Sequence, residues 1–234
     1  MKIHRNISNT INYLIDEWIP PAIRDSKLFI WPAFHLLFGE KKKYFMEFKE
    51  KAPFLTKEEY REYYRITADK HIERATDLNT KSIEKILADI KGQSVLDAGA
   101  GRGYLADLIV KKKGLNVTGM DIYIPVGQRN SENPRFIEGD TEEIPFPDNS
   151  FDTVICTHTL EHVMDKNKTL SELRRVAQKR LIIVVPRQRE NKYTFDLHLS
   201  FFPYPHSLLM LTRNASAECI VLNNDIYYKE DIQD

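Results

Sequence analysis

A short apolar strand followed by three alternating glycines constrains the fold of this chain more than any other feature. The stretch SVLDAGAGRGYLADLIVKKKG, residues 94–114, passes from an apolar run through Asp97 into a helical pattern. Its glycines have the spacing G-x-G-x-G and are Gly99, Gly101 and Gly103. A glycine-rich turn between a strand and a helix lets the backbone approach a ligand closely. We therefore predict a ligand-binding turn, with a close-packed turn that holds no ligand as the alternative.

Strand-like and helical segments alternate after this turn. Apolar runs predict five strands, at residues 95–96, 116–122, 135–140, 151–160 and 180–186. Asp165 is placed to cap a helix before the last of these strands, and another helix is expected near 206–214. Several of the runs are apolar throughout, which is typical of a parallel sheet with helices on both faces.

The C-terminal tail completes the predicted fold. AECIVLNN (217–224) and DIYYKE (225–230) predict two strands that pair antiparallel around Asn223 and Asn224. The fold class is therefore α/β: a doubly wound, mostly parallel seven-stranded sheet with helices on both faces, plus a helical N-terminal extension. We place the extension at residues 1–78 and the ligand-binding domain at residues 79–234.

The first 90 residues contain no convincing strand. Thr56 and Glu59 have the spacing of a capping box and predict the start of a helix. Prolines predict irregular pieces in the extension, and Pro32 is expected to break the apolar run LFIWPAFHLLFG at 28–39. That run is also too short to cross a membrane, since a transmembrane helix needs roughly 20 residues.

Charge and cysteine content narrow the class of protein. Lys plus Arg and Asp plus Glu both number 34, so the formal net charge is zero. That balance argues against a protein that wraps nucleic acid through its overall charge, and no nucleic-acid partner is expected. Cys156 and Cys219 lie in apolar runs and are expected to be buried free thiols in a reducing compartment. No secretory signal is expected, so the predicted location is cytoplasmic.

The spacing of the glycines discriminates between possible ligands. A dinucleotide fingerprint, G-x-G-x-x-G, needs a small third residue where Tyr104 stands. A nucleotide-binding P-loop needs a lysine and a hydroxyl residue after its last glycine, but Tyr104 and Leu105 follow here. These departures disfavour a nicotinamide-dependent oxidoreductase and a P-loop nucleotidase.

The remaining pattern resembles the class I S-adenosylmethionine-dependent methyltransferases. Their first motif is an acid followed by G-x-G-x-G, which LDAGAGRG matches, and the resemblance extends from about Ser94 to Pro186. It implies S-adenosylmethionine as cofactor, with Asp97 near its ammonium group, Asp121 on the ribose hydroxyls and Asp140 on the adenine amino group. The full set of implied cofactor-binding residues is Asp97, Gly99, Gly101, Gly103, Asp121, Ile122, Asp140, Thr141 and Thr157.

Candidate residues for the methyl acceptor are less sharply defined. His198, on the loop after the fifth strand, and His158, at the end of the fourth, are candidate catalytic groups because histidine titrates near neutral pH. A histidine satisfied by the loop backbone is an equal alternative for His198. Tyr63, Tyr64 and His162 are candidate acceptor-binding residues, although aromatic core packing also accounts for the tyrosines. No cluster has convincing metal-ligand spacing, so no metal is predicted.

The predicted function is S-adenosylmethionine-dependent methyl transfer to a small-molecule or saccharide or lipid-linked acceptor, at oxygen. After the fourth strand, amino-methylating nucleic-acid enzymes have the tetrapeptide D/N-P-P-Y/F, but this chain has CTHT. This difference argues against methylation of a nucleic-acid amino group. The alternative is a non-catalytic S-adenosylmethionine-binding regulatory or partner subunit. The aromatic stretch 18–39 has four interpretations: a lid over the carboxyl edge of the sheet, a homodimer contact, a peripheral membrane contact, or ordinary packing against the sheet domain.

Overall fold

The computed structural model describes residues 18–67, 75–124, 131–193 and 196–232, which belong to two compact units. The helical unit comprises the described parts of Met1–Arg74 and of Gln188–Phe201. The α/β unit comprises Ala75–Arg187 and Phe202–Asp234. The sequence-based division ended the extension at residue 78 and left 188–201 in the second domain. In the structure, that segment is part of the helical unit.

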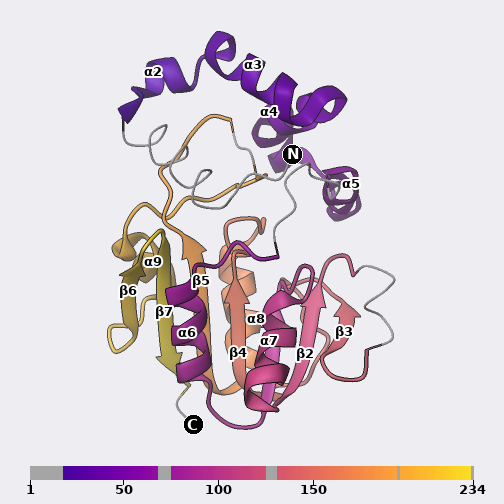
Figure 1. The fold of residues 1–234 in the computed structure, drawn as a ribbon, viewed down its shortest axis with the longest axis vertical. Coiled ribbons are helices and arrows are strands. Elements are labelled where there is room, and N and C mark those ends of the chain that lie inside the picture. Colours follow the sequence, from indigo (N-terminus) through magenta and orange to yellow (C-terminus); the bar gives the residue numbers. More distant parts are fainter. Residues whose placement is uncertain (1–17, 68–74, 125–130, 194–195, 233–234) are drawn as a thin grey trace. The chain divides into compact units, whose positions relative to one another are not determined.

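The α/β unit is built on one seven-stranded sheet in the order β3-β2-β1-β4-β5-β7-β6 (Figure 1). Its strands are β1 (Ser94–Ala98), β2 (Asn116–Asp121), β3 (Arg135–Glu138), β4 (Phe151–Thr157), β5 (Ala177–Pro186), β6 (Glu218–Leu222) and β7 (Asp225–Asp231). Strands β1 to β5 are parallel, while β7 runs antiparallel to both β5 and β6. The predicted mostly parallel, seven-stranded sheet is confirmed, including the C-terminal hairpin.

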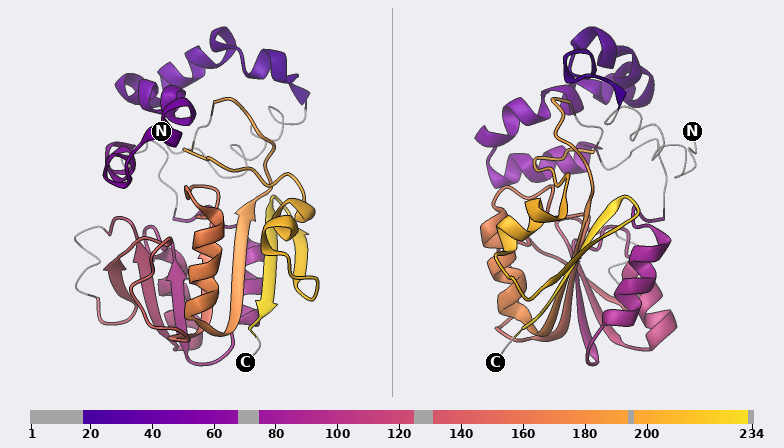
Figure 2. Two further views of the ribbon diagram at one scale, coloured as in Figure 1. Left: turned by 180° about the vertical axis from the view of Figure 1, so that it is seen from behind. Right: turned by 90° about the vertical axis from the view of Figure 1, so that its left-hand side faces the viewer.

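Helices cover both faces of this sheet, as the edge-on view in Figure 2 shows. They are α6 (Thr80–Asp89), α7 (Tyr104–Lys113), α8 (Lys166–Val176) and α9 (Pro205–Thr212). The apolar side chains of α6 and α7 are buried in one core cluster, and those of α8 and α9 in another. The sheet therefore separates two hydrophobic layers, as expected of a doubly wound fold.

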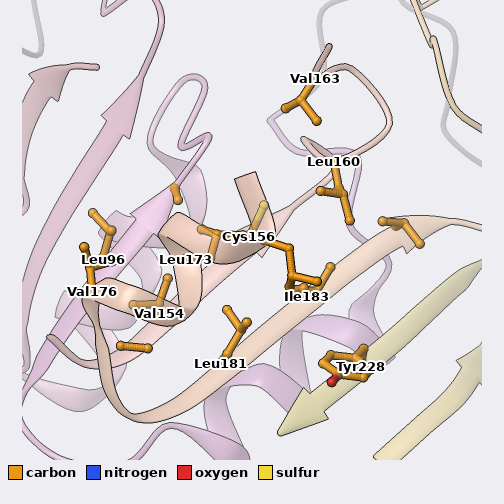
Figure 3. Packing of buried hydrophobic residues seen from close by; sticks show 14 of the residues in the cluster. Leu96, Val154, Cys156, Leu160, Val163, Leu173, Val176, Leu181, Ile183 and Tyr228 are labelled. Atoms are coloured by element: carbon orange, nitrogen blue, oxygen red, sulfur yellow. The ribbon is translucent and has the colours of Figure 1, made fainter. Parts of the chain in front are cut away.

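Strand β5 illustrates why its sequence is apolar throughout. Leu181 and Ile183 pack toward α8, with Leu173 and Tyr228 in the same cluster (Figure 3). Ile182 and Val184 point to the other layer, which holds the helices α6 and α7. Since successive residues of a strand face opposite sides, a strand covered on both faces needs an unbroken apolar run.

Local sequence signals mark most of the helix ends. Asp165 caps α8 by accepting a hydrogen bond from the Lys168 amide, at 3.0 Å. Gly114 ends α7 in the left-handed conformation, after three lysines in its last turn. Helix α8 ends at Val176, and β5 begins directly at Ala177, before the predicted start of that strand at residue 180.

The helical unit contains short helices and 3₁₀ turns along the chain. They are α2 (Pro21–Arg24), α3 (Lys27–Phe38), η1 (Gly39–Lys41), α4 (Lys42–Lys51), η2 (Ala52–Phe54) and α5 (Lys57–Thr67). The predicted capping box of α5 is confirmed: the Thr56 amide donates to Glu59 Oε2 at 2.8 Å, and the Glu59 amide to Thr56 Oγ1 at 3.3 Å.

The prediction that Pro32 breaks the 28–39 run was wrong, because α3 continues through it. An internal proline removes one backbone donor and costs about 3 kcal/mol in a helix. Three side chains on one face of α3, Ile30, Phe34 and Phe38, are buried, and burial of each contributes about 1.5–3 kcal/mol. Their packing offsets the local cost of the proline.

None of the helices in the described parts of the chain combines the length and the apolar character needed to cross a membrane.

An ion pair between the half-buried Arg174 and the buried Glu230 joins α8 to β7. Arg174 binds Glu230 through two hydrogen bonds, of 2.6 and 2.8 Å, and also donates to the Thr212 carbonyl at the end of α9. Glu230 is only 4% exposed and accepts a further hydrogen bond from the Tyr228 hydroxyl at 2.6 Å. The guanidinium is therefore the charge that balances a buried carboxylate.

We expect Arg174→Met to lower the free energy of unfolding of the α/β unit by about 3–5 kcal/mol, because Glu230 would remain buried without a cation. Adding Glu230→Gln should restore part of the loss, since the double variant buries no charge. Chemical denaturation measures both effects, with the exposed Lys112→Met in α7 as control. Equal stability of Arg174→Met and Lys112→Met would show that the pair contributes nothing.

Candidate functional site

The glycine turn after β1 adopts a backbone that only glycine adopts readily. Gly99, Gly101 and Gly103 have φ angles of +85°, +54° and +76°, all in the left-handed region. The amides of Gly99 and Ala100 both donate to the Met120 carbonyl of β2, at 2.7 and 3.0 Å. The turn is thus held against the end of the neighbouring strand, and the G-x-G-x-G spacing follows from its backbone conformation.

The first two glycines meet different surroundings. A Cβ atom at Gly99 would overlap the side chain of Thr159, so this residue is small for packing reasons. A Cβ atom at Gly101 would meet no atom within 4 Å. Gly101 therefore lies where the turn borders open space, as expected if its backbone is approached by a ligand.

Asp97 carries a buried carboxylate that lacks a partner. It is 1% exposed, and neither of its oxygens accepts a hydrogen bond from the described residues. Burial, and secondly the negative charge of Asp121, raise the pKa of Asp97 to about 7, with a weaker opposing effect of the Ala106 amide. An unpaired buried carboxylate is costly, so this position suits a cationic ligand.

Asp121 ends β2 directly beside the glycine turn. Its Oδ2 accepts a hydrogen bond from the Gly101 amide at 2.8 Å, and Oδ1 accepts one from the Tyr123 amide at 3.4 Å. Burial raises the pKa of Asp121, and these amides act in the opposite direction. Two carboxylates therefore face the turn from neighbouring strands.

The other predicted cofactor residues also follow the strands at the same edge of the sheet. Ile122 comes directly after β2, Thr157 is the last residue of β4, and Asp140 and Thr141 lie just beyond β3. Asp140 accepts a hydrogen bond from the Glu142 amide at 2.9 Å, which closes a tight turn. The roles of these residues in cofactor binding stay predictions.

The strand order places this edge at a topological switch point. The connection after β1 leads to its neighbour β2 on one side, whereas β4, reached after β3, lies on the other side of β1. Ligands of open α/β sheets bind beyond the carboxyl ends of the strands at such a point. The glycine turn and Asp97 thus occupy the place where this fold class binds its ligands.

His158 is held by acids in the α/β unit. Its Nε2 lies 3.3 Å from Asp225 Oδ1 at the start of β7, and its Nδ1 lies 3.7 Å from Glu161 Oε1. Burial alone would lower the pKa of His158, but the two carboxylates outweigh it and raise that pKa to about 9. The imidazole is therefore positively charged at neutral pH.

Asp225 was not singled out from the sequence, yet it organises this corner of the sheet. Besides facing His158, it accepts hydrogen bonds from Asn79 Nδ2 at 2.6 Å and Ser82 Oγ at 2.7 Å, both near the start of α6. Its partners are more than 60 residues away along the chain, so no local motif announces the cluster. The acid at the start of a predicted strand was the sole sequence signal.

His198 belongs to the helical unit. It is 8% exposed, and its Nδ1 lies 2.7 Å from Gln188 Oε1. Because an amide oxygen only accepts hydrogen bonds, this contact favours the tautomer with the proton on Nδ1 and the lone pair on Nε2. That tautomer is compatible with a proton acceptor.

Basic side chains from the N-terminal helices hold the segment 188–201 that carries His198. Arg24 donates to the Glu190 carbonyl at 2.7 Å, and Lys49 donates to the Asn191 carbonyl. Lys49 also lies over the ring of Phe201, 4.0 Å from its centre. Burial lowers the pKa of Lys49 to about 8, which reflects how far this ammonium group is withdrawn from water.

The candidate acceptor-binding residues have mainly local partners. The ring of Tyr63 packs against Tyr44 and Phe48 at centroid distances of 5.4 and 5.7 Å, and the Tyr64 hydroxyl lies 3.3 Å from that of Tyr60. These contacts favour the aromatic-core interpretation of both tyrosines, and a pocket role stays a prediction. The His162 amide donates to the Thr159 carbonyl in the turn after β4, at 2.9 Å.

We expect Asp97→Asn to stabilise the ligand-free protein at alkaline pH. The folded-state pKa of about 7 lies above the ordinary value of 3.8, so wild-type stability should fall as pH rises from about 4 to about 7. Asparagine carries no charge and removes this loss, so the variant should exceed wild type by about 2–4 kcal/mol at pH ~8.

Chemical denaturation at pH ~5 and ~8 measures the difference. The exposed Asp107→Asn in α7 is the control and should change neither value. A lower stability of Asp97→Asn than of wild type at pH ~8 would mean that the ionised carboxylate has a stabilising partner in the free protein.

Comparisons with known proteins concern mainly the α/β unit. A family model described as a methyltransferase domain matches residues 96–185, from within β1 to near the end of β5. Sterol 24-C-methyltransferase ERG6B of Gibberella zeae is 39% identical over 94 residues, which are 36% of this chain and 25% of that protein. Demethylmenaquinone methyltransferase of Paenarthrobacter aurescens is 37% identical over 118 residues, 45% of this chain and 46% of that protein.

The chain thus spans less than half the length of both curated relatives. Among solved structures, a SAM-dependent methyltransferase from Aquifex aeolicus has a TM-score of 0.51 at 20% identity, covering 64% of this chain and 89% of that one. This likeness supports the fold. Residues 96–185 are therefore similar to a methyltransferase domain, and the glycine turn at the switch point lies within this matched region.

Proposed function

We propose that the chain binds S-adenosylmethionine at the glycine turn and transfers its methyl group to an oxygen of a small-molecule acceptor. The observation that carries the proposal is the buried, unpaired carboxylate of Asp97 beside this turn. S-adenosylmethionine carries an ammonium and a sulfonium group and no phosphate. A carboxylate without a cation, next to a turn without a phosphate-binding lysine, fits that ligand.

Each residue at the edge of the sheet has a proposed part in holding the cofactor. Asp97 accepts hydrogen bonds from the ammonium group, and the open side of Gly101 admits the amino-acid part of the ligand. Asp121 accepts hydrogen bonds from the ribose hydroxyls, and Asp140 from the adenine amino group. Three neighbours complete the proposed site: Ile122, Thr141 and Thr157.

When bound, the cofactor supplies a methyl group on a positively charged sulfur. The chain's own part is to orient the two reactants and to remove the proton of an acceptor hydroxyl. His198 is the proposed base, since the hydrogen bond of its Nδ1 to Gln188 favours a lone pair on Nε2. His158 is a poor base at neutral pH, because its raised pKa keeps it protonated. We assign it to positioning the end of β4.

A lipid-linked or saccharide acceptor is the preferred class. The helical unit is rich in aromatic side chains, which supply apolar walls for an acceptor. Two of the relatives are named for a sterol and for demethylmenaquinone, both lipid-like molecules. We propose that the helical unit, which carries His198, contributes residues that bind the acceptor.

Cofactor affinity should depend on the ionisation of Asp97. Since only the ionised carboxylate attracts the ammonium group, the affinity for S-adenosylmethionine should fall by up to about tenfold per pH unit below pH ~7. Asp97→Asn should bind weakly at every pH and show no such dependence. Isothermal titration measures both, with Asp107→Asn as control. An affinity of Asp97→Asn equal to that of wild type would show that Asp97 does not contact the cofactor.

Loss of the proposed base should affect turnover and not cofactor binding. We expect His198→Ala to lower turnover by about 10²–10⁴-fold with nearly unchanged S-adenosylmethionine affinity. Lys49→Met should lower turnover in the same way, because it releases the Asn191 carbonyl and with it the segment that carries His198. Formation of S-adenosylhomocysteine with a panel of saccharide and lipid-linked acceptors is the readout.

The exposed His206 in α9 offers a matched control, since His206→Ala should leave turnover unchanged. A fully active His198→Ala would show that another group removes the proton of the acceptor hydroxyl. Cofactor binding by wild type without turnover on any acceptor of the panel would favour the alternative function, a non-catalytic S-adenosylmethionine-binding subunit.

A further inference from the structure

Helix α3 is apolar on both of its sides. Its inner face packs in the helical unit through Ile30, Phe34 and Phe38. On the opposite face, Leu28 is 90% exposed and Leu36 is 82% exposed. Surface helices of globular proteins carry polar residues on the side that faces water. The outward face of α3 therefore lacks the polar side chains that are typical of a helix face exposed to water.

The helical unit has further exposed apolar side chains besides Leu28 and Leu36. Of the large hydrophobic residues that are exposed in the described parts of the chain, seven of twelve lie between residues 18 and 54: Trp18, Ile23, Leu28, Phe29, Trp31, Leu36 and Phe54. Exposed apolar side chains are thus more frequent in this stretch of the chain than in the rest of the described residues. The two tryptophans of the chain, Trp18 and Trp31, are both among them.

Positive charges border this surface at both ends of α3. Lys27 is the first residue of the helix, and Lys41, Lys42 and Lys43 follow its last turn. None of the ion pairs among the described residues includes these four lysines, although Lys27 and Lys43 help to lower the pKa of the Glu47 carboxyl. The Lys42 ammonium lies 5.8 Å from the centre of the Trp31 ring, so the basic and aromatic groups are adjacent.

The length of α3 distinguishes a helix that crosses a membrane from one that lies on its surface. With 12 residues, α3 is far shorter than the roughly 20 residues that a membrane-spanning helix needs. Unlike an isolated interfacial helix, α3 has no polar face, because its inner side packs in the helical unit. Its outward face is apolar and is flanked by lysines and tryptophan, which are residue types that lie at membrane interfaces. Lysines next to such a face are attracted to the negative surface of anionic bilayers.

We propose that the outward face of α3, with Lys27 and Lys41 to Lys43, binds the surface of an anionic phospholipid membrane. The apolar side chains, Leu28 and Leu36 foremost, enter the headgroup region, while the ammonium groups contact lipid phosphates. The charge pattern favours this occupant over a second copy of the chain, because two copies would bring like charges together. This inference is independent of methyl transfer and concerns where the protein is held.

Vesicle co-sedimentation of the full chain tests the proposal. The protein should sediment with vesicles of phosphatidylcholine and phosphatidylglycerol and remain in solution with phosphatidylcholine alone. The fluorescence of Trp18 and Trp31 should shift to shorter wavelength on addition of the anionic vesicles, because both rings leave water. High salt should weaken binding, since it screens the lysines.

Two variants separate the apolar and the charged contributions. Leu28→Gln with Leu36→Gln should lower the partition into anionic vesicles by about tenfold or more. Lys42→Gln with Lys43→Gln should lower it and reduce the salt dependence. Matched controls in the α/β unit are Met210→Gln, an exposed apolar residue of α9, and Lys111→Gln with Lys112→Gln in α7. Neither control should change binding.

Three outcomes would overturn the proposal. The first is no sedimentation with either kind of vesicle. The second is equal loss in the α3 variants and in their controls, which would make the binding non-specific. The third is a concentration-dependent dimer in light scattering that Leu28→Gln with Leu36→Gln abolishes, because α3 would then be covered by a second copy. Circular dichroism of each variant verifies that the exposed substitutions leave the fold intact.

Discussion

The site of this protein depends on one electrostatic constraint, a buried carboxylate that has no cationic partner among the residues that the structure describes. Asp97 lies near the C-terminal end of β1, between β2 and β4 in the sheet, and is 1% exposed. The charge of Asp121, one strand away, adds to the cost. A cationic ligand beside Asp97 would offset the free-energy cost of burying its charge. The arrangement therefore favours binding of a positively charged group.

The helical unit is stabilised by a different kind of interaction, hydrogen bonds from cationic side chains to backbone carbonyls. Arg24 and Lys49 each donate to a carbonyl of the 188–201 segment, and Asp25 accepts a hydrogen bond from the Lys192 amide at 3.0 Å. These contacts fold a distant part of the chain onto the N-terminal helices. As a result, the candidate base His198 and the exposed apolar face of α3 belong to one unit.

Sequence patterns predicted the α/β unit well because its signals are local. Strand β5 is apolar throughout since helices cover both its faces, and the alternating glycines match three left-handed backbone positions. The same reasoning failed at Pro32, where the burial of Ile30, Phe34 and Phe38 outweighs the local preference of a proline. The His158–Asp225 contact also escaped detection, because it joins residues that only the sheet order brings together.

The sequence by itself determined the class of fold, the glycine turn and the acids at the ends of the strands, since each follows from periodicity or from a backbone that only glycine adopts readily. Tertiary structure decided the burial, the charge partners and the packing of these groups. It buried Asp97 without a side-chain partner in the described parts of the chain, placed two carboxylates beside His158 that raise its pKa, and joined residues 188–201 to the N-terminal helices. Burial and pairing depend on residues far apart in the chain, and for that reason no stretch of sequence specifies them alone.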